Sequence, residues 1–457
     1  MSILGKSYNI SKELNGENAV LFAQWIGCSN VIRNSKIRES DLSKGVNQAY
    51  SHIKKEYSFM KNIPVQILRN SISELKSSFT AAEKGIRKAP KIKPKHRKRS
   101  AIITSELFTK TPVSESSTLI TIFSNANKNK QEVFSKIVEF AADKLGNQIR
   151  ISRQGSDFSL SFSFDDGIER ASNDALLEDL SHLTIEELKE KTIGVDRNVV
   201  VAAYASDNKK YHYNPEEQQK LKELSRKKAH YQRILAKKKI KHKKNVENQK
   251  LKAKNDKKET KNLSLELNFK GSKQASLQKK ISNFDKKIKH IRTNACHHWS
   301  RELADNAPAL TVFEDLKLKN MTKKAKPKLN ENGRGYAKNN KAAKSGLNRA
   351  ILNVALGRFG DFSKYKLNLL GKAWMDVNPY RTSVIHNFCG GKNTERPTQA
   401  KLVCHDCKKE VHADFNASQN IEDRGIQYLK DGTFLKKRKA SKRTTFRKTK
   451  VVEVEST

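Results

Sequence analysis

Three acidic residues stand where their carboxylates can bind divalent metal ions. Asp196 lies in the apolar, β-branched segment TIGVDRNVVVAAYAS, and Glu314 ends the apolar run ALTVFE. Asp414 opens the helical pattern ADFNASQNI. Asp315 follows Glu314, but in extended backbone it must point to the opposite face, so only one of the two can share a site with Asp196. We choose Glu314.

The order of these acids indicates a chemistry. A strand acid, a strand-end acid and a late helix acid, separated by about a hundred residues each, form the layout of a two-metal nuclease on an RNase H-like sheet. One ion activates water and the other stabilises the leaving 3′ oxygen, and an all-carboxylate site suits two Mg²⁺ ions. Taken singly, an acid in a strand is more often structural, and an exposed hairpin position is the alternative for Asp196.

A second cluster has the spacing of zinc ligands. His386 and Cys389 are separated by two residues, as are Cys404 and Cys407, with fourteen residues between the pairs. Each half can turn tightly enough to aim both side chains at one tetrahedral ion, which predicts a structural zinc ribbon holding one Zn²⁺. The alternative is an unliganded Cys389 thiol beside a surface His386.

Other histidines and cysteines have less claim to a metal. His405 and His412 are possible substitutes if His386 is not a ligand. Cys28 and Cys296 stand alone and are expected to be ordinary packing residues, because five cysteines in so long a chain do not make a disulfide framework.

The charge of the chain predicts a polyanionic partner. Lys and Arg number 92 against 48 Asp and Glu in 457 residues, which gives a net charge of +44. A nucleic acid is the partner that best offsets such self-repulsion. No apolar run approaches the ~20 residues that span a bilayer, so we expect no membrane contact and an intracellular, soluble protein.

The elements that must position these residues follow from periodicity and turn chemistry. Residues 36–90 have apolar positions at helical spacing, and residues 147–164 alternate as a hairpin about Gly155. A helix is predicted to begin at Asn214 and Pro215, the first of a basic helical pair over 214–304.

Four segments in this order resemble one known family. They are GVDRNVVVAAYASD, TVFEDLKLKNM, YKLNLLGKAWMDVNPYRTSVIHNFCG and ERPTQAKLVCHDCKKEVHADFNASQNI. They resemble the TnpB proteins of insertion sequences and the related miniature type V CRISPR effectors, which are RNA-guided DNA endonucleases. The resemblance is strong over residues 186–425 and looser over the amino-terminal part.

The resemblance implies a multidomain α+β fold and the site residues. Asp196, Glu314 and Asp414 would be the carboxylates of the RuvC-like domain, and Thr382 and Ser383 would form a turn before the ribbon. The implied domains are a β-barrel wedge domain (1–35 and 106–185), an inserted helical recognition lobe (36–105), an RNase H-like (RuvC) α/β nuclease domain (186–380 and 411–430), a zinc ribbon (381–410) and a disordered basic tail (431–457).

The resemblance also implies the partners and the reaction. A guide RNA would pair with one strand of target double-stranded DNA, the protein would read a short flanking motif, and the two-metal site would cleave. The resemblance implies that segment 322–346 is a lid over the site. A solvated loop explains this segment about equally well. We expect a monomer on the RNA, cytoplasmic and nucleoid-associated if the protein is prokaryotic, and nuclear if eukaryotic.

Three rival functions remain open. A nuclease-inactive RNA-guided repressor should have lost an acid, but all three are present. A DDE-type transposase would use three acids on the same fold, but it lacks a ribbon just before the last acid. The third is a basic RNA-packaging protein in which the three acids have no catalytic role. A DNA cleavage assay would distinguish it from a nuclease.

Overall fold

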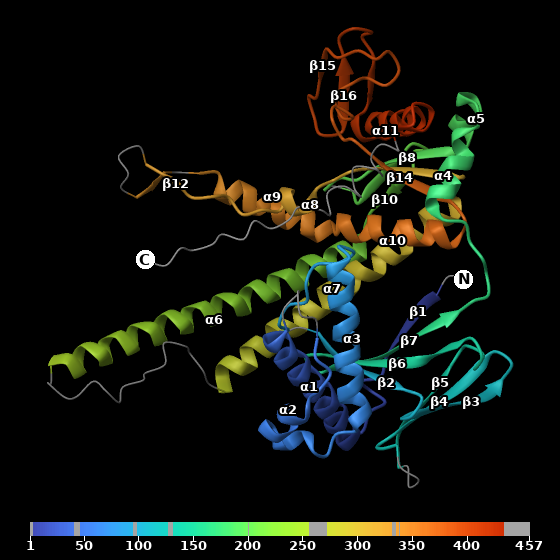
Figure 1. The fold of residues 1–457 in the computed structure, drawn as a ribbon. Coiled ribbons are helices and arrows are strands. Elements are labelled where there is room, and N and C mark those ends of the chain that lie inside the picture. The colour runs from blue at the N-terminus through green and yellow to red at the C-terminus, as the bar shows by residue number, and fades with distance from the viewer. Residues whose placement is uncertain are drawn as a thin grey trace, which may run out of the picture. The chain divides into compact units, whose positions relative to one another are not determined.

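A computed structural model describes residues 3–40, 46–94, 98–126, 131–199, 201–255, 272–330, 335–337 and 339–433. The fold is mixed α+β and multidomain, as predicted. It divides into two compact units, of which the first ends at Arg170 and the second begins at Ala171 (Figure 1).

The first unit contains two antiparallel sheets. One has the order β1-β7-β6-β2, built from β1 (Ile3–Asn9), β7 (Asp157–Asp165), β6 (Leu145–Gln154) and β2 (Arg99–Thr104). The other joins β3 (Phe108–Ser114), β4 (Ser117–Phe123) and β5 (Glu132–Val138). The hairpin predicted about Gly155 is confirmed, because β6 pairs with β7 and Gly155 has φ +66°. No ladder joins the two sheets among the described strands, so the β-barrel stays a prediction.

Helices of the first unit begin earlier in the chain than we expected. They are α1 (Gly16–Glu39), α2 (Ser51–Glu56), a 3₁₀ turn at Ser58–Met60, and α3 (Val65–Glu83). Residues 16–35, which we assigned to the β domain, are therefore helical, and residues 99–104, which we assigned to the helical lobe, form β2. The periodicity of α1 was obscured because its buried face also carries Ser29, Asn30 and Lys36.

The second unit is organised around one mixed sheet of order β10-β9-β8-β11-β14. Three strands run parallel, namely β8 (Thr192–Asp196), β11 (Leu310–Glu314) and β14 (Ala373–Val377). β9 (Ala203–Ala205) pairs with β8 in antiparallel orientation, and β10 (Lys210–Tyr211) pairs with β9 in antiparallel orientation. Phe313 packs on one face, with residues of α7 and α10, and Val312 packs on the other, with residues of α11.

Helices cover both faces of this sheet (Figure 1). Those that pack on it are α4 (Asn173–Ser181), α5 (Ile185–Glu190), α7 (Ser272–Asn306), α10 (Leu356–Leu369) and α11 (Ala413–Lys430). The second unit also contains α6 (Pro215–Asn255), α8 (Leu318–Met321) and α9 (Lys341–Val354). The predicted start of α6 is confirmed, since the Asn214 side chain accepts a hydrogen bond from Glu217 N at 2.7 Å. The helical pair is also present, with the rings of Tyr231 (α6) and Phe284 (α7) stacked at 5.7 Å.

The boundary between the units differs from our prediction. Residues 171–185, which we assigned to the wedge domain, belong to the second unit. The Asn173 side chain exchanges two hydrogen bonds with the backbone of Trp374, and Leu177 is buried with Val312 and Met375. This short segment is held by packing on the sheet, which its own sequence does not reveal.

The remaining strands are short. A hairpin of β12 (Lys328–Leu329) and β13 (Tyr336–Ala337) falls within the segment predicted as a lid, and α9 begins inside that segment as well. The ribbon segment contains β15 (Thr394–Glu395), β16 (Lys401–Cys404) and β17 (Glu410–His412). Residues 434–457 of the predicted basic tail lie outside the described residues. Among the described helices, none combines the length and apolarity that a bilayer crossing requires.

Candidate functional site

Two neighbouring parallel strands bring Asp196 and Glu314 together. Val195 of β8 is in register with Phe313 of β11, and each acid is the next residue on its strand. Adjacent strands lie about 4.8 Å apart and residues in register share a face. The two carboxylates therefore leave the same face at the carboxyl ends of β8 and β11, where they are 8% and 7% exposed.

The third acid is carried to this face by α11. Asp414 lies in the first turn of α11, which packs directly on β8 and β11 at two glycines. A Cβ on Gly194 would lie 2.0 Å from the Ser418 carbonyl oxygen, and a Cβ on Gly425 would lie 2.4 Å from Val312 Cγ2. Only the absence of a side chain at both positions allows this approach.

The electrostatics of the three carboxylates reflect their convergence. Burial raises the pKa of Asp196 well above its ordinary value, and the charges on Glu314 and Asp414 raise it further. Burial also raises the pKa of Glu314, against the opposing effect of a hydrogen bond from Thr382. Clustered carboxylates that disfavour one another's ionisation are stabilised by a bound cation.

The spacing of the acids limits how a cation can bind. Among the described residues, only the His386 cluster brings three or more potential ligand atoms of His, Cys, Asp and Glu all within 4.8 Å of one another. The three carboxylates are therefore more widely spaced. Ligands of one Mg²⁺ at ~2.1 Å lie within about 4.2 Å of one another, whereas two ions ~4 Å apart accept a wider set. As they stand, the three carboxylates therefore do not all reach one Mg²⁺ ion.

Thr382 fixes the orientation of Glu314. Its hydroxyl donates to Glu314 Oε1 at 2.7 Å, and Thr382 is buried. Two side chains of α11 hold the segment that contains Thr382 in place. Asn420 Nδ2 donates to Thr382 O at 2.8 Å, and Asn416 Nδ2 donates to Ile385 O at 2.7 Å. The turn predicted at Thr382 and Ser383 thus lies beside the acids, with Thr382 directed inward and Ser383 exposed.

Two arginines that lie near the acids were not predicted from the sequence. Arg396, from the ribbon segment, lies with Nη2 3.9 Å from Asp414 Oδ1, and its charge opposes the rise in the pKa of Asp196. Arg197 is buried behind the strands and donates to the Glu314 carbonyl oxygen. Arg197 directly follows the candidate acid Asp196, so the sequence could have indicated that it lies near the site. No local sequence pattern indicates that Arg396 lies near Asp414.

The exposure of several other residues that we considered in the sequence can be compared with our expectations. Asp315 is exposed, as expected for the opposite face. Tyr204 and Trp299, which we considered as base-stacking residues, are 2% and 7% exposed, whereas Tyr336 is 69% exposed. Cys28 and Cys296 are buried packing residues, as predicted.

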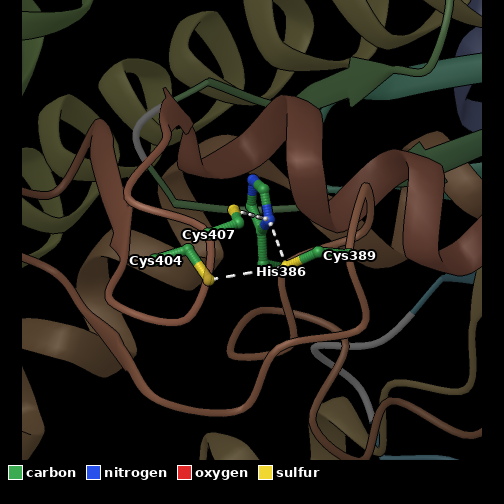
Figure 2. A group of neighbouring side chains, drawn as sticks. All are labelled: His386, Cys389, Cys404 and Cys407. Carbon is green, nitrogen blue, oxygen red and sulfur yellow. Dashed lines mark hydrogen bonds between the residues drawn. The ribbon is translucent and has the colours of Figure 1, made fainter.

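The predicted zinc ligands form one cluster (Figure 2). His386 Nδ1 lies 3.1 Å from Cys389 Sγ and 3.4 Å from Cys407 Sγ, and Cys389 Sγ lies 3.6 Å from Cys404 Sγ. All four ligand atoms are within 4.8 Å of one another. Tetrahedral zinc, with bonds of ~2.0–2.3 Å, separates its ligand atoms by roughly 3.3–3.8 Å. The donor set therefore fits a closed zinc site.

Local structure explains how the ligands converge. A Cβ on Gly391 would lie 2.8 Å from Cys404 Sγ and 3.0 Å from Cys389 Sγ, so the turn must pass close to the sulfurs. The substitutes for His386 are excluded by their positions. His405 Nε2 lies 3.4 Å from Glu395 Oε2, and the His412 ring stacks on Tyr204 at 4.9 Å.

The fold and site define an α+β protein with two buried carboxylates, a partly buried third acid, and a His/Cys₃ cluster that could hold a metal ion. Residues 357–421 match the family model "Cas12f1-like, TNB domain". This segment carries the four candidate zinc ligands and Asp414. The chain is also 33% identical over 156 residues to the "Putative RNA-guided DNA endonuclease InsQ" of Escherichia coli (strain K12). That match spans 34% of this chain and 37% of the relative.

Two solved structures match this chain at low sequence identity. A Cas12f1–sgRNA–target DNA complex has a TM-score of 0.48 and 15% identity, over 89% of this chain and 83% of the other. The mini-RNA-guided endonuclease CRISPR-Cas_phi3 has a TM-score of 0.38 and 13% identity, over 68% of this chain and 58% of the other.

Proposed function

We propose that this chain is an RNA-guided DNA endonuclease that hydrolyses phosphodiester bonds with two divalent ions. The observation that carries the proposal is the convergence of Asp196, Glu314 and Asp414 on one face of the sheet. The sequence relation to InsQ supports RNA guidance and a DNA target. The net charge of +44 supports a chain that holds a structured RNA and a DNA at once.

The sheet supports an RNase H-like (RuvC) nuclease domain. Its order β10-β9-β8-β11-β14, with β9 antiparallel and β11 and β14 parallel to β8, has the first strand at the centre. The acids lie where the parallel strands end, which is where open α/β sheets bind ligands. In this proposal the first unit supplies a wedge domain with a helical recognition lobe, and segment 322–346 is the lid.

The chain's own residues would each have a defined task. Asp196, Glu314 and Asp414 would hold the ions, and Thr382 keeps Glu314 Oε1 in one orientation. Mg²⁺, when bound, supplies activation of water and stabilisation of the leaving 3′ oxygen. Arg396 presents a cation next to Asp414, where the scissile phosphate must approach. Burial of Asp196 and Glu314 limits their contact with bulk water and strengthens these interactions.

The ribbon would position rather than react. A four-ligand zinc site has no open position, so it builds structure. His386, Cys389, Cys404 and Cys407 would hold one Zn²⁺ and so fix the start of α11, since Cys407 precedes Asp414 by only seven residues. The proposed partners are a guide RNA and target double-stranded DNA, with one protein copy per RNA, in the cytoplasm if the source is prokaryotic and in the nucleus if it is eukaryotic.

The test uses the purified protein with the RNA that copurifies with it, identified by sequencing. We expect cutting of matched double-stranded DNA in Mg²⁺. Glu314→Gln should lower the rate by at least about 10³-fold, the order seen when an essential catalytic group is removed. Asp315→Asn is the matched control, because the Asp315 carboxylate, next to Glu314 in the chain, is exposed and faces away from the site. This variant should cut DNA at the normal rate. Equal activity of both variants would refute the site, as would cutting by Asp196→Ala.

A further inference from the structure

A basic groove lies in the second unit, lined by α6, α7, α9 and the loop after α8. Its volume is about 1010 Å³. The lining contains six cationic side chains, namely Lys228, Arg233, Arg292, Lys324, Lys341 and Arg349. None of them belongs to the carboxylate cluster or to the candidate zinc site.

The charge of the groove is almost uncompensated. Asp285 is the only acid in the lining, and it pairs with Lys228 at 2.6 Å, so the lining carries 6 − 1 = +5. The described part of the chain offers no ion pair to Arg233, Lys341 or Arg349. Five like charges around one concave space repel one another, and a polyanion in the groove would relieve this repulsion.

The walls of the groove are held in place before any ligand arrives. The Lys228–Asp285 pair joins α6 to α7, and Arg292 Nη2 donates to Asn353 Oδ1 at 2.6 Å, which joins α7 to α9. Asn348 Nδ2 donates to Thr322 O at 3.0 Å and so fixes the loop that carries Lys324. A preformed site loses less conformational entropy on binding.

The lining also indicates which part of a polyanion is recognised. It contains no aromatic side chain, so bases have nothing to stack on. Lys341 and Arg349 are eight residues apart on α9, or about 12 Å at 1.5 Å per residue. At the ~3.4 Å rise per phosphate along a strand whose bases are stacked in helical form, this length spans three to four phosphates.

We propose that this groove binds the sugar–phosphate backbone of a single nucleic-acid strand, without reading its sequence. The inference goes beyond the proposed function, because it concerns where a strand is held and not how it is cut. The strand is RNA or DNA, which share this backbone, and the test distinguishes them.

The test measures binding by the full-length protein, freed of copurifying nucleic acid and without Mg²⁺. The probes are a single-stranded RNA and a single-stranded DNA of the same scrambled sequence. The variant is the triple Arg233→Gln, Lys341→Gln, Arg349→Gln, in which all three positions are exposed. The control is Lys237→Gln, Lys239→Gln, Lys244→Gln, which removes equal charge from exposed positions of α6 outside the groove.

Each phosphate contact with a single strand contributes ~0.7 to the slope of log K against log salt. Losing three contacts should therefore lower the slope by about 2 and raise Kd roughly 50-fold at 0.15 M salt, with an unchanged melting temperature. A loss with both probes is the result expected for recognition of the shared backbone, whereas a loss with RNA alone assigns the groove to RNA and a loss with DNA alone assigns it to DNA. An unchanged slope, or an equal loss in the control triple, would overturn the proposal. Because no cleavage is measured, failure here leaves the proposed nuclease intact, and failure of cleavage leaves the groove intact.

Discussion

Gly194→Ala tests whether the close contact of α11 with β8 positions the third acid. The added Cβ would lie 2.0 Å from the Ser418 carbonyl oxygen and 2.7 Å from the Glu422 backbone nitrogen. Both neighbours are backbone atoms, so no side chain can rotate away. Restoring an ordinary contact of ~3.4 Å requires α11 to move by about 1.4 Å.

This movement should have two measurable effects. Overpacking of this kind costs about 1–3 kcal/mol of unfolding free energy. A displacement of about 1 Å in a catalytic group can cost ~10²-fold in rate, and α11 carries Asp414. We therefore expect Gly194→Ala to lower the free energy of unfolding, measured in urea, by about 1–3 kcal/mol. We also expect it to lower the rate of DNA cleavage in Mg²⁺ by roughly 100-fold.

Gly346→Ala is the matched control. Gly346 lies inside α9, and no neighbouring atom comes within 4 Å of the place that an alanine Cβ would occupy. Alanine should therefore fit there and stabilise the helix by ~0.5–1 kcal/mol. If Gly194→Ala were as stable and as active as the wild-type protein, α11 would not be held at this distance, and our explanation of how Asp414 reaches the site would be wrong.

Three further predictions concern single side chains. Thr382→Val should slow cleavage by about 10–100-fold, as loss of a residue that orients a metal ligand does, while Thr382→Ser should keep most of the activity; equal rates would contradict the role of the hydroxyl. Cys404→Ser should lower bound zinc, by elemental analysis, and the melting temperature; unchanged zinc would remove the ribbon. Burial raises the pKa of Glu422 in the folded chain, so the folded state binds its proton more tightly and stability falls as pH rises from the unfolded value of 4.5. Glu422→Gln should then be more stable than wild type in urea at pH 7 but not at pH 4, and the same difference at both pH values would refute this.

Two local features of the candidate site could be predicted from the sequence. The period-two alternation of strands predicted that Glu314 and Asp315 point to opposite faces, and Glu314 is buried while Asp315 is exposed. The paired spacing of His386, Cys389, Cys404 and Cys407 likewise predicted a cluster that the structure contains. In both cases a local rule of geometry was sufficient.

Long-range contacts were the part that the sequence could not predict. Arg396 reaches Asp414 because the ribbon folds back over the start of α11, and no local pattern encodes that return. The helix α1 was missed because its buried positions include polar residues such as Asn30, which break the apolar period. The roles of Gly194 and Gly425 also appear only once α11 lies on the sheet.

The most direct test of the central claim is an anomalous-scattering map from crystals of the protein–RNA–DNA complex grown with Mn²⁺. We predict two peaks ~4 Å apart among the carboxylates of Asp196, Glu314 and Asp414. A zinc peak at His386 and its three cysteines serves as the internal control. A map that shows the zinc peak but no Mn²⁺ between the three carboxylates would contradict the account.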